Sequence, residues 1–539
     1  MAGITPHILI VDDQRPFQLM LKGILHSLGY RHIDFAHHGE LALQRCQQQR
    51  YQIIFIDYNL GTGKNGRQLL DDLRQFGLLD PDAICMLVTG ENTVPMVISA
   101  VELEPDDYLM KPFSQSVLRM RLQRIQQKKQ QLLPLYQAMS MKDWPTAEVQ
   151  ARFLLTQAPR YAPYLRRILV QALLHTRQID AARTELSPLL AERRPPWALL
   201  QLARIELESG QHPRCQQLCE EALAGNKYLV EAYDLQSENL ARSGDPDHAR
   251  QLLKKALEIS PFQLQRLEQF FQLSVATDQQ EDWLAAARQM YELTRRAGSN
   301  DPRQLLNYVR CLLNAACAST DPGNKNRLQQ ESLLLIHRAR RDEHLLRKID
   351  YEMFETVCMA RLDAADGRQL QARRSCLDLV TQYVDGSPLA ADLAMLCDQV
   401  NEYELSEQLQ AQLLFGTDSI AERLWQQQQQ QIAPQRLAFS QFSRQGLSCY
   451  QSADYAGASQ NYEQALQLAP LHSSTQLNLL QSLLQYISTE PKPAPGLAAK
   501  PLELLRRIRQ QALSAEHQER LQQLQEQFDA LKAQGKTGT

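Results

Sequence analysis

The stretch HILIVDDQRP, residues 7–16, places two adjacent aspartates directly after a run of apolar residues. Residues 8–11 have the pattern of a buried strand, whereas Asp12 and Asp13 are like charges that raise each other's pKa when they lie side by side. A cation would make such a pair stable at the end of a buried strand. The rest of the sequence must therefore supply the other groups of a cation site.

Up to about residue 125, short β-rich runs alternate with helical runs. We expect strands at 7–11, 32–36, 51–57, 83–89 and 107–110, and helices at 15–28, 39–49, 66–77, 93–101 and from 114 onward. This alternation predicts an α/β domain with a five-stranded parallel sheet of the flavodoxin-like order 2-1-3-4-5, covered by helices on both faces. Ligands bind at the carboxyl ends of the strands in such sheets.

Further polar groups follow the other predicted strands. Asp57 ends the third strand, Thr89 ends the fourth, and Lys111 follows the fifth. Carboxylate ligands with open positions suit Mg²⁺, and a carboxylate in this setting can attack a phosphoryl donor to give an aspartyl phosphate. A haloacid-dehalogenase-type site would need D-x-D-x-T after the first strand, and the sequence there is Asp-Asp-Gln-Arg.

This constellation resembles the receiver domain of response regulators, the CheY-like family, over residues 5–127. The resemblance implies that Asp57 is the phosphoacceptor, and that Mg²⁺ binds to Asp12, Asp13, Asp57 and the backbone carbonyl of Asn59. Phosphoryl-binding and switch roles are implied for Thr89, Gly90, Tyr108, Lys111 and Pro112, with a cis peptide bond before Pro112. Tyr108 would move inward when Thr89 moves, and Gly90 would leave access to the acyl phosphate.

The loop after Asp57, DYNLGTGKNG, departs from the family pattern. Gly61 stands where receivers usually have a proline, and Gly66 comes one residue late. The inserted residue and the three glycines allow more backbone conformations. We expect this loop to affect phosphorylation kinetics and kinase docking, without removing the site.

Beyond residue 130 the β-rich runs give way to amphipathic helices with a 34-residue period. Small residues recur at this period, as do two glycines in turns between helices, and prolines follow the ends of several units. The residues expected to pack the helix pairs are Ala147, Ala181, Cys215, Ala249, Ala256, Pro261, Gly446, Ala458, Ala465 and Pro470. The pattern resembles the tetratricopeptide repeat, in which small side chains let two antiparallel helices approach and proline ends the second helix. An all-α superhelical solenoid is the implied fold.

These patterns divide the chain into five segments. We expect a receiver at 1–127, repeats at 128–300, degenerate helical repeats at 301–437, a C-terminal repeat at 438–485, and a loop with capping helices at 486–539. The basic run 114–133 is interpreted as the last receiver helix extended into a linker with a solvated face, with nucleic-acid binding as the alternative. The glutamine run 426–431 is interpreted as a solvated helix end before Pro434.

Composition narrows the class of protein. The formal net charge of −3 over 539 residues argues against a nucleic-acid-coating protein. Ten scattered cysteines without a C-x-x-C pair indicate buried thiols in a reducing compartment rather than a zinc site. There is neither a signal-peptide pattern nor an apolar run long enough to span a membrane, so we expect a soluble cytoplasmic protein.

As a whole, the chain resembles tetratricopeptide-repeat response regulators of the VieB type, found in bacterial two-component phosphorelays. The resemblance implies phosphotransfer to Asp57 from a sensor histidine kinase or phosphotransfer protein, and a repeat solenoid that binds or releases a protein partner, such as a cyclic-di-GMP signalling enzyme. We expect no enzymatic activity beyond the receiver's own aspartyl phosphorylation and dephosphorylation.

Three alternatives stay open: a constitutive scaffold or phosphate sink, an enzyme, and a DNA-binding transcription regulator, although no helix-turn-helix is found. Receiver homodimerisation through the fourth and fifth helices is also open. No membrane partner is expected.

Overall fold

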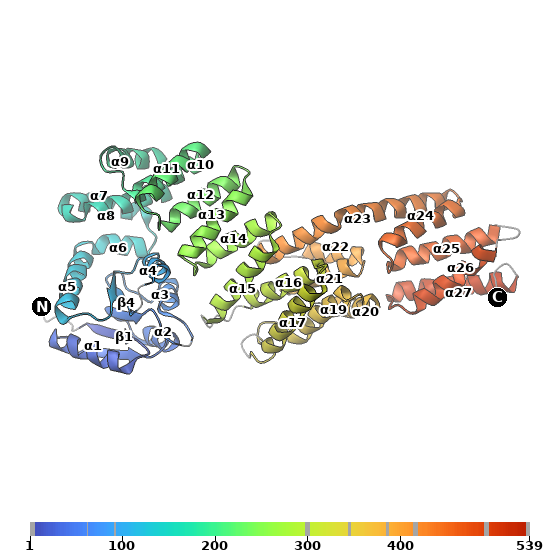
Figure 1. Ribbon diagram of the computed structural model, residues 1–539, viewed down its shortest axis with the longest axis horizontal. Coiled ribbons are helices and arrows are strands. Elements are labelled where there is room, and N and C mark those ends of the chain that lie inside the picture. The colour runs from blue at the N-terminus through green and yellow to red at the C-terminus, as the bar shows by residue number, and fades with distance from the viewer. Residues whose placement is uncertain are drawn as a thin grey trace. The chain divides into compact units, whose positions relative to one another are not determined.

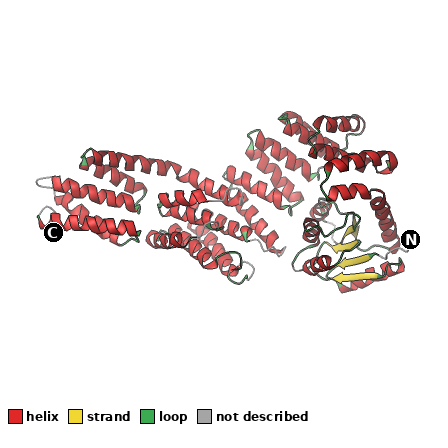
Figure 2. Cartoon of the chain, turned by 180° about the vertical axis from the view of Figure 1, so that it is seen from behind, coloured by secondary structure: helices red, strands yellow, loops and turns green. Residues whose placement is uncertain are grey.

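The computed structural model describes residues 6–61, 63–90, 93–296, 302–342, 346–383, 387–412, 419–489 and 495–534. Contacts between residues divide the chain into two compact units, 1–299 and 300–539. An α/β domain opens the first unit, and the regular elements of the described residues after it are helices (Figures 1 and 2). In the part of the chain that the structure describes, no helix has the length and apolar character needed to cross a membrane.

The α/β domain contains the predicted sheet. Its strands are β1 (His7–Val11), β2 (His32–Ala36), β3 (Ile53–Asp57), β4 (Ile84–Thr89) and β5 (Asp107–Met110), all parallel and in the order β2-β1-β3-β4-β5. The predicted fold class is thus confirmed. The third and fourth strands begin slightly later than the β-rich sequence runs that predicted them.

Five helices cover this sheet: α1 (Arg15–Ser27), α2 (Gly39–Gln48), α3 (Gly66–Gln75), α4 (Val94–Val101) and α5 (Gln115–Gln131). Successive side chains of a strand point to opposite faces, so each strand contributes to two cores. Ile8 and Phe55 pack with side chains of α1 and α5, whereas Leu9 and Ile54 pack with those of α2 and α3. Burial on both faces explains why these strands are almost entirely apolar.

Ten helices follow in the first unit and form antiparallel pairs. They are α6 (Leu133–Ser140), α7 (Trp144–Gln157), α8 (Ala162–His175), α9 (Ile179–Glu192), α10 (Pro196–Glu208), α11 (His212–Gly225), α12 (Val230–Arg242), α13 (Pro246–Ile259), α14 (Leu264–Ala276) and α15 (Gln280–Arg296), with the short 3₁₀ helix η1 (Pro159–Tyr161) after α7. Within pairs, the turn often holds a left-handed residue, such as Gly210 at φ +72° or Gly244 at φ +90°. Glycine adopts that conformation without a steric penalty.

The second unit consists of helices in its described residues. These are α16 (Arg303–Ala318), α17 (Pro322–Ala339), α19 (Tyr351–Ala365), α20 (Gln369–Gln382), α21 (Ala390–Gln399), α22 (Tyr403–Gln412), α23 (Ser419–Gln451), α24 (Tyr455–Leu468), α25 (Ser473–Thr489), α26 (Pro495–Arg509) and α27 (Ala515–Ala533). Successive helices pack against one another, as α23 does against α24 and α24 against α25. This architecture is consistent with a solenoid.

Most small residues of the 34-residue pattern lie inside helix pairs. Fully buried side chains occur at Ala147, Cys215, Ala249, Ala256, Ala458 and Ala465. Ala181 packs against the same core but is only half-buried, and its neighbour Ala182 takes the fully buried position, one residue later. Pro261 and Pro470 follow the ends of α13 and α24. The 34-residue period is not exact here, because the second helices of successive helix pairs do not begin at equal intervals along the chain.

The glutamine run 426–431 does not form a solvated helix end. Helix α23 continues through it and through Pro434, so the domain boundary expected after residue 437 falls inside a helix. Gln428 donates a side-chain hydrogen bond to the carbonyl of Met395 at 3.1 Å, and Gln429 donates one to Asp398. Contacts with α21 therefore hold the run in place, and tertiary packing overrides its low-complexity composition.

The basic face of α5 also has partners. Arg121 pairs with Asp107 at 2.7 Å and Lys129 with Asp106 at 3.0 Å, while Lys128 lies 3.8 Å from the centre of the Tyr164 ring. These contacts tie α5 to β5 and to α8. The expectation of a merely solvated linker face is wrong for these side chains.

Gly446 gives a test of helix-pair packing. A Cβ atom at this position would lie 2.8 Å from the Tyr462 ring, so Gly446→Ala should destabilise the second unit by about 1–3 kcal/mol, the usual cost of overpacking. Hydrogen exchange of α24 amides in the full-length protein measures the loss. Gly496→Ala is the matched control, because its Cβ meets nothing within 4 Å. Equal exchange in both variants would contradict close packing of α23 on α24.

Candidate functional site

Three aspartates gather at the carboxyl edge of the sheet. Asp12 and Asp13 follow β1, Asp57 ends β3, and one carboxylate oxygen from each lies within 4.8 Å of the others. Asp12 and Asp57 are buried, whereas Asp13 is exposed. The arrangement expected from the strand ends is therefore present, and it is open to solvent on the Asp13 side.

Lys111 joins the two buried carboxylates. Its Nζ lies 2.7 Å from Oδ2 of Asp12 and 2.7 Å from Oδ2 of Asp57. The peptide bond between Lys111 and Pro112 is cis, and the Lys111 backbone N–H donates to the carbonyl of Thr89 at 2.8 Å. The ammonium also lies 3.8 Å from the centre of the Phe17 ring, a cation–π contact from α1. These contacts direct one positive charge to the place where two strands present carboxylates.

Burial governs the charge state of Asp57. Desolvation raises the pKa of its carboxyl to about 6, although Lys111 and the backbone N–H of Asn59 act in the opposite direction and nearby Asp12 raises it further. The Asn59 N–H lies 3.3 Å from Asp57 Oδ1. Burial and the Lys111 ammonium therefore act on the pKa of this carboxyl in opposite directions.

Gln18 supports the site, and the sequence interpretation missed it. This buried side chain of α1 donates from Nε2 to the backbone carbonyls of Asp12, at 2.6 Å, and Ala36, at 3.1 Å. It thereby fixes the end of β1 against the end of β2. A signal was present, because Gln18 lies on the same helical stripe as the buried Leu21 and Leu25, where an apolar residue would be expected.

The residues to which the family resemblance assigns phosphoryl-binding and switch roles lie in the same part of the domain. Thr89 is buried at the end of β4, and a Cβ atom on Gly90 would meet nothing within 4 Å. Tyr108 is half-buried against the core on the α2–α3 side of the sheet. Pro112 follows the cis bond, as described above.

The loop after Asp57 closes onto the site in spite of its inserted residue. Gly66 donates its N–H to the carbonyl of Tyr58 at 2.8 Å, and a Cβ atom on Gly66 would lie 2.0 Å from the Asp57 carbonyl oxygen. Gly61 and Gly63 have φ values of +74° and +96°. The glycine is therefore required at position 66.

The donor set fits a divalent cation. Three carboxylates face one ammonium, which leaves an excess of negative charge, and the ligands are the hard oxygens that Mg²⁺ prefers. Asp13 is exposed and leaves room for water molecules, which Mg²⁺ retains.

Comparisons with known proteins find similarity over the α/β domain. Residues 8–123 match the family model of the response regulator receiver domain. Aerobic respiration control protein ArcA of Escherichia coli K12 is 31% identical over 121 residues, which cover 22% of this chain and 48% of ArcA. Chemotaxis protein CheY of Thermotoga maritima is 28% identical over 109 residues, which cover 20% of this chain and 88% of CheY. The crystal structure of Vibrio cholerae CheY4 is 24% identical, covers 23% of this chain and 99% of its own, and has a TM-score of 0.21.

The fold and the site thus define a CheY-like receiver, and residues 8–123 form a response regulator receiver domain. The chain spans about half the length of ArcA, and the match lies in the receiver.

Gly66 tests the loop geometry. Gly66→Ala forces a methyl group into the Asp57 carbonyl and should destabilise the receiver by about 3 kcal/mol, at the upper end of overpacking costs. Hydrogen exchange of the β3 amides measures the effect. Gly23→Ala in α1 is the control, since its Cβ meets nothing within 4 Å, and should stabilise α1 by about 0.5–1 kcal/mol. A receiver that tolerates both changes equally would contradict the close approach.

Proposed function

We propose that this protein is a phosphorylation-controlled, protein-binding regulator. Asp57 accepts a phosphoryl group from a sensor histidine kinase or phosphotransfer protein, and the conformational shift makes the helical region bind or release a protein partner. The observation that carries the proposal is the Asp57–Lys111–Asp12 arrangement, with Lys111 Nζ at 2.7 Å from both carboxylates. A cytoplasmic location follows from this role.

The chemistry can be assigned to residues of this chain. An Oδ atom of Asp57 attacks the phosphorus, the new P–O bond forms as the bond to the donor nitrogen breaks, and the donor histidine leaves. Lys111 already lies at hydrogen-bond distance from Oδ2 of Asp57 and can pair with the phosphoryl oxygens. Asp12, Asp13, Asp57 and the Asn59 carbonyl would hold Mg²⁺, which supplies positive charge against the phosphoryl oxygens when bound. Thr89 would turn its hydroxyl onto the phosphoryl group and Tyr108 would follow inward.

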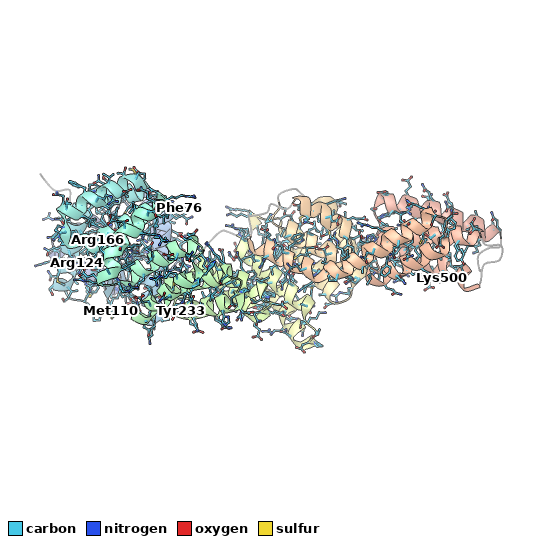
Figure 3. All side chains as sticks on the ribbon, turned by 90° about the horizontal axis from the view of Figure 1, so that it is seen from above. Phe76, Met110, Arg124, Arg166, Tyr233 and Lys500 are labelled. Carbon is cyan, nitrogen blue, oxygen red and sulfur yellow. The ribbon has the colours of Figure 1, made fainter. Side chains whose placement is uncertain are left out.

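The helical region supplies the output. Paired helices with small residues buried between them, such as Ala249 and Ala458, support assignment to the tetratricopeptide-repeat type, which presents extended surfaces to proteins. The resemblance to VieB-type regulators makes a cyclic-di-GMP signalling enzyme a candidate partner. We propose no enzymatic activity for this region. Receiver homodimerisation is a compatible arrangement, because Val101 of α4 and Met110 of β5 are exposed apolar side chains. Met110 is labelled in Figure 3.

The central test is phosphorylation and partner capture. Asp57→Asn should abolish Mg²⁺-dependent labelling by a phosphoryl donor, and should abolish the change in captured partners that beryllofluoride, a phosphoryl mimic, produces in the wild type. Asp82→Asn is the matched control, an exposed aspartate of the same domain that lies away from the site. If the wild type captures the same partners with and without the mimic, a constitutive scaffold or phosphate sink replaces this proposal.

Magnesium binding is tested separately. Asp13→Asn removes one of three carboxylates and should weaken Mg²⁺ binding by about tenfold or more, the scale seen when support of a metal site is lost. Isothermal titration calorimetry of the full-length protein measures the affinity, with Asp82→Asn again as control. Unchanged affinity in Asp13→Asn would remove Asp13 from the ligand set.

A further inference from the structure

Helices α3 and α4 of the receiver lie against the helical region of the same compact unit. α4 packs on α13, and the residues around Glu102, just after α4, meet the start of α14. Both receiver helices begin at the phosphoacceptor edge, α3 at Gly66 and α4 shortly after Thr89. A change at Asp57 therefore has a short route to this contact.

Arg266 of α14 is the centre of the contact. Its side chain is 4% exposed and forms a two-pronged ion pair with Asp234 of α12, at 2.7 and 2.8 Å. The same guanidinium donates to Oε1 of Glu102 from the receiver at 2.8 Å. Burial lowers the pKa of Arg266, but the two carboxylates outweigh burial and raise it, so the guanidinium stays charged. One buried arginine thus links the receiver to two helices of the solenoid.

Two serines extend this network. Ser260 donates from Oγ to Oε2 of Glu102 at 2.5 Å, and Oγ of Ser99 in α4 lies 3.1 Å from Oγ of Ser260. Both serines are fully buried, and Arg266 also donates to the Ser260 carbonyl at 3.0 Å. Both carboxylate oxygens of Glu102 are therefore hydrogen-bonded to the helical region. We call Ser99, Glu102, Asp234, Ser260 and Arg266 the α4 clamp.

A second set of contacts starts from α3. Arg67, which follows the glycine packed on the Asp57 carbonyl, donates to the Gln263 side chain at 2.6 Å and to the Phe262 carbonyl. Gln68 donates to the carbonyl of Leu293 at 3.0 Å. Arg67 is 6% exposed. The segment just before α14 is thereby held by both receiver helices.

The polar character of this contact makes it responsive to small movements. Hydrogen bonds to buried charged groups are satisfied over a narrow range of geometry, and a displaced partner leaves an uncompensated buried charge. A shift of α4 would take the Glu102 carboxylate from Arg266 and from the Ser260 hydroxyl, both of which donate to it, until water replaced it. The contact is therefore either closed or open, which is what a switch requires.

We propose that the α4 clamp is closed while the Asp57 carboxylate pairs with Lys111, and that phosphorylation of Asp57 opens it. This inference rests on the proposed function and names its regulatory contact. The closed state is the one seen here, since Lys111 Nζ lies 2.7 Å from the Asp57 carboxylate. A phosphoryl group adds charge and volume at the edge from which α3 and α4 depart. Because coupling is reciprocal, a weakened clamp should also favour binding of the phosphoryl mimic.

Hydrogen–deuterium exchange of the full-length protein tests the clamp, with Mg²⁺ and with or without beryllofluoride. In the wild type the mimic should speed exchange of amides in residues 258–268 on the order of tenfold, a usual size for allosteric coupling. Glu102→Gln preserves volume but removes the charge that faces Arg266, and should speed the same exchange without the mimic and tighten beryllofluoride binding. Glu104→Gln is the matched control, because Glu104 lies two residues away and pairs with Arg167 on the exposed rim.

The outcomes separate the clamp from the proposed function. If the mimic protects amides of loop 57–66 but leaves exchange at 258–268 unchanged, it has bound and the clamp is overturned, while partner capture can still depend on phosphorylation. If Glu102→Gln and Glu104→Gln behave alike in exchange and in mimic affinity, the clamp is also overturned. If loop 57–66 gains no protection from the mimic, the receiver does not accept a phosphoryl group, and both proposals fall.

Discussion

The ammonium of Lys111 holds together two carboxylates that would otherwise repel each other in a buried position. Asp12 and Asp57 come from the adjacent strands β1 and β3, and Lys111 reaches them from β5, across β4. The contact therefore fixes the relative positions of strands at one edge of the sheet. Loops that leave this edge start from a defined geometry, and α3 and α4 are built on two of them.

Local patterns made the receiver predictable from the sequence. Apolar strands alternate with amphipathic helices, and four of the five strands end in or are followed by a polar group of the site. The sheet order and the meeting of Asp12, Asp57 and Lys111 therefore followed from topology. Gln18 was missed because a polar residue on a buried helical stripe has no local partner to indicate its role. The loop that contains Gly66 was recognised as unusual. The close approach of Gly66 to the Asp57 carbonyl could not be predicted, because it depends on the backbone conformation of a loop with an inserted residue.

The helical region was predictable where repetition is strict. Helices α7, α9 and α11, each the second helix of its pair, begin at Trp144, Ile179 and His212. The intervals between these starts are 35 and 33 residues instead of 34, so the fully buried position falls at 182 and not at Ala181. Pro434 was interpreted as a helix end because proline lacks an N–H. Inside α23 the carbonyl left without its N–H partner belongs to Gln430, an exposed residue, and the packing of α23 against α24 and α21 offsets the cost of a proline inside a helix.

Contacts between segments far apart in the chain could not be predicted from the sequence, and the α4 clamp shows why. Glu102 and Arg266 are 164 residues apart, and each lies in a stretch that reads as an ordinary amphipathic surface. An apolar contact at this place would tolerate sliding, because dispersion and burial change gradually with position. Directional hydrogen bonds to a buried guanidinium do not tolerate sliding, so a small shift of α4 breaks an interaction completely instead of weakening it gradually. A receiver whose output depends on small displacements at a sheet edge gains a sharp response from a contact of this second kind.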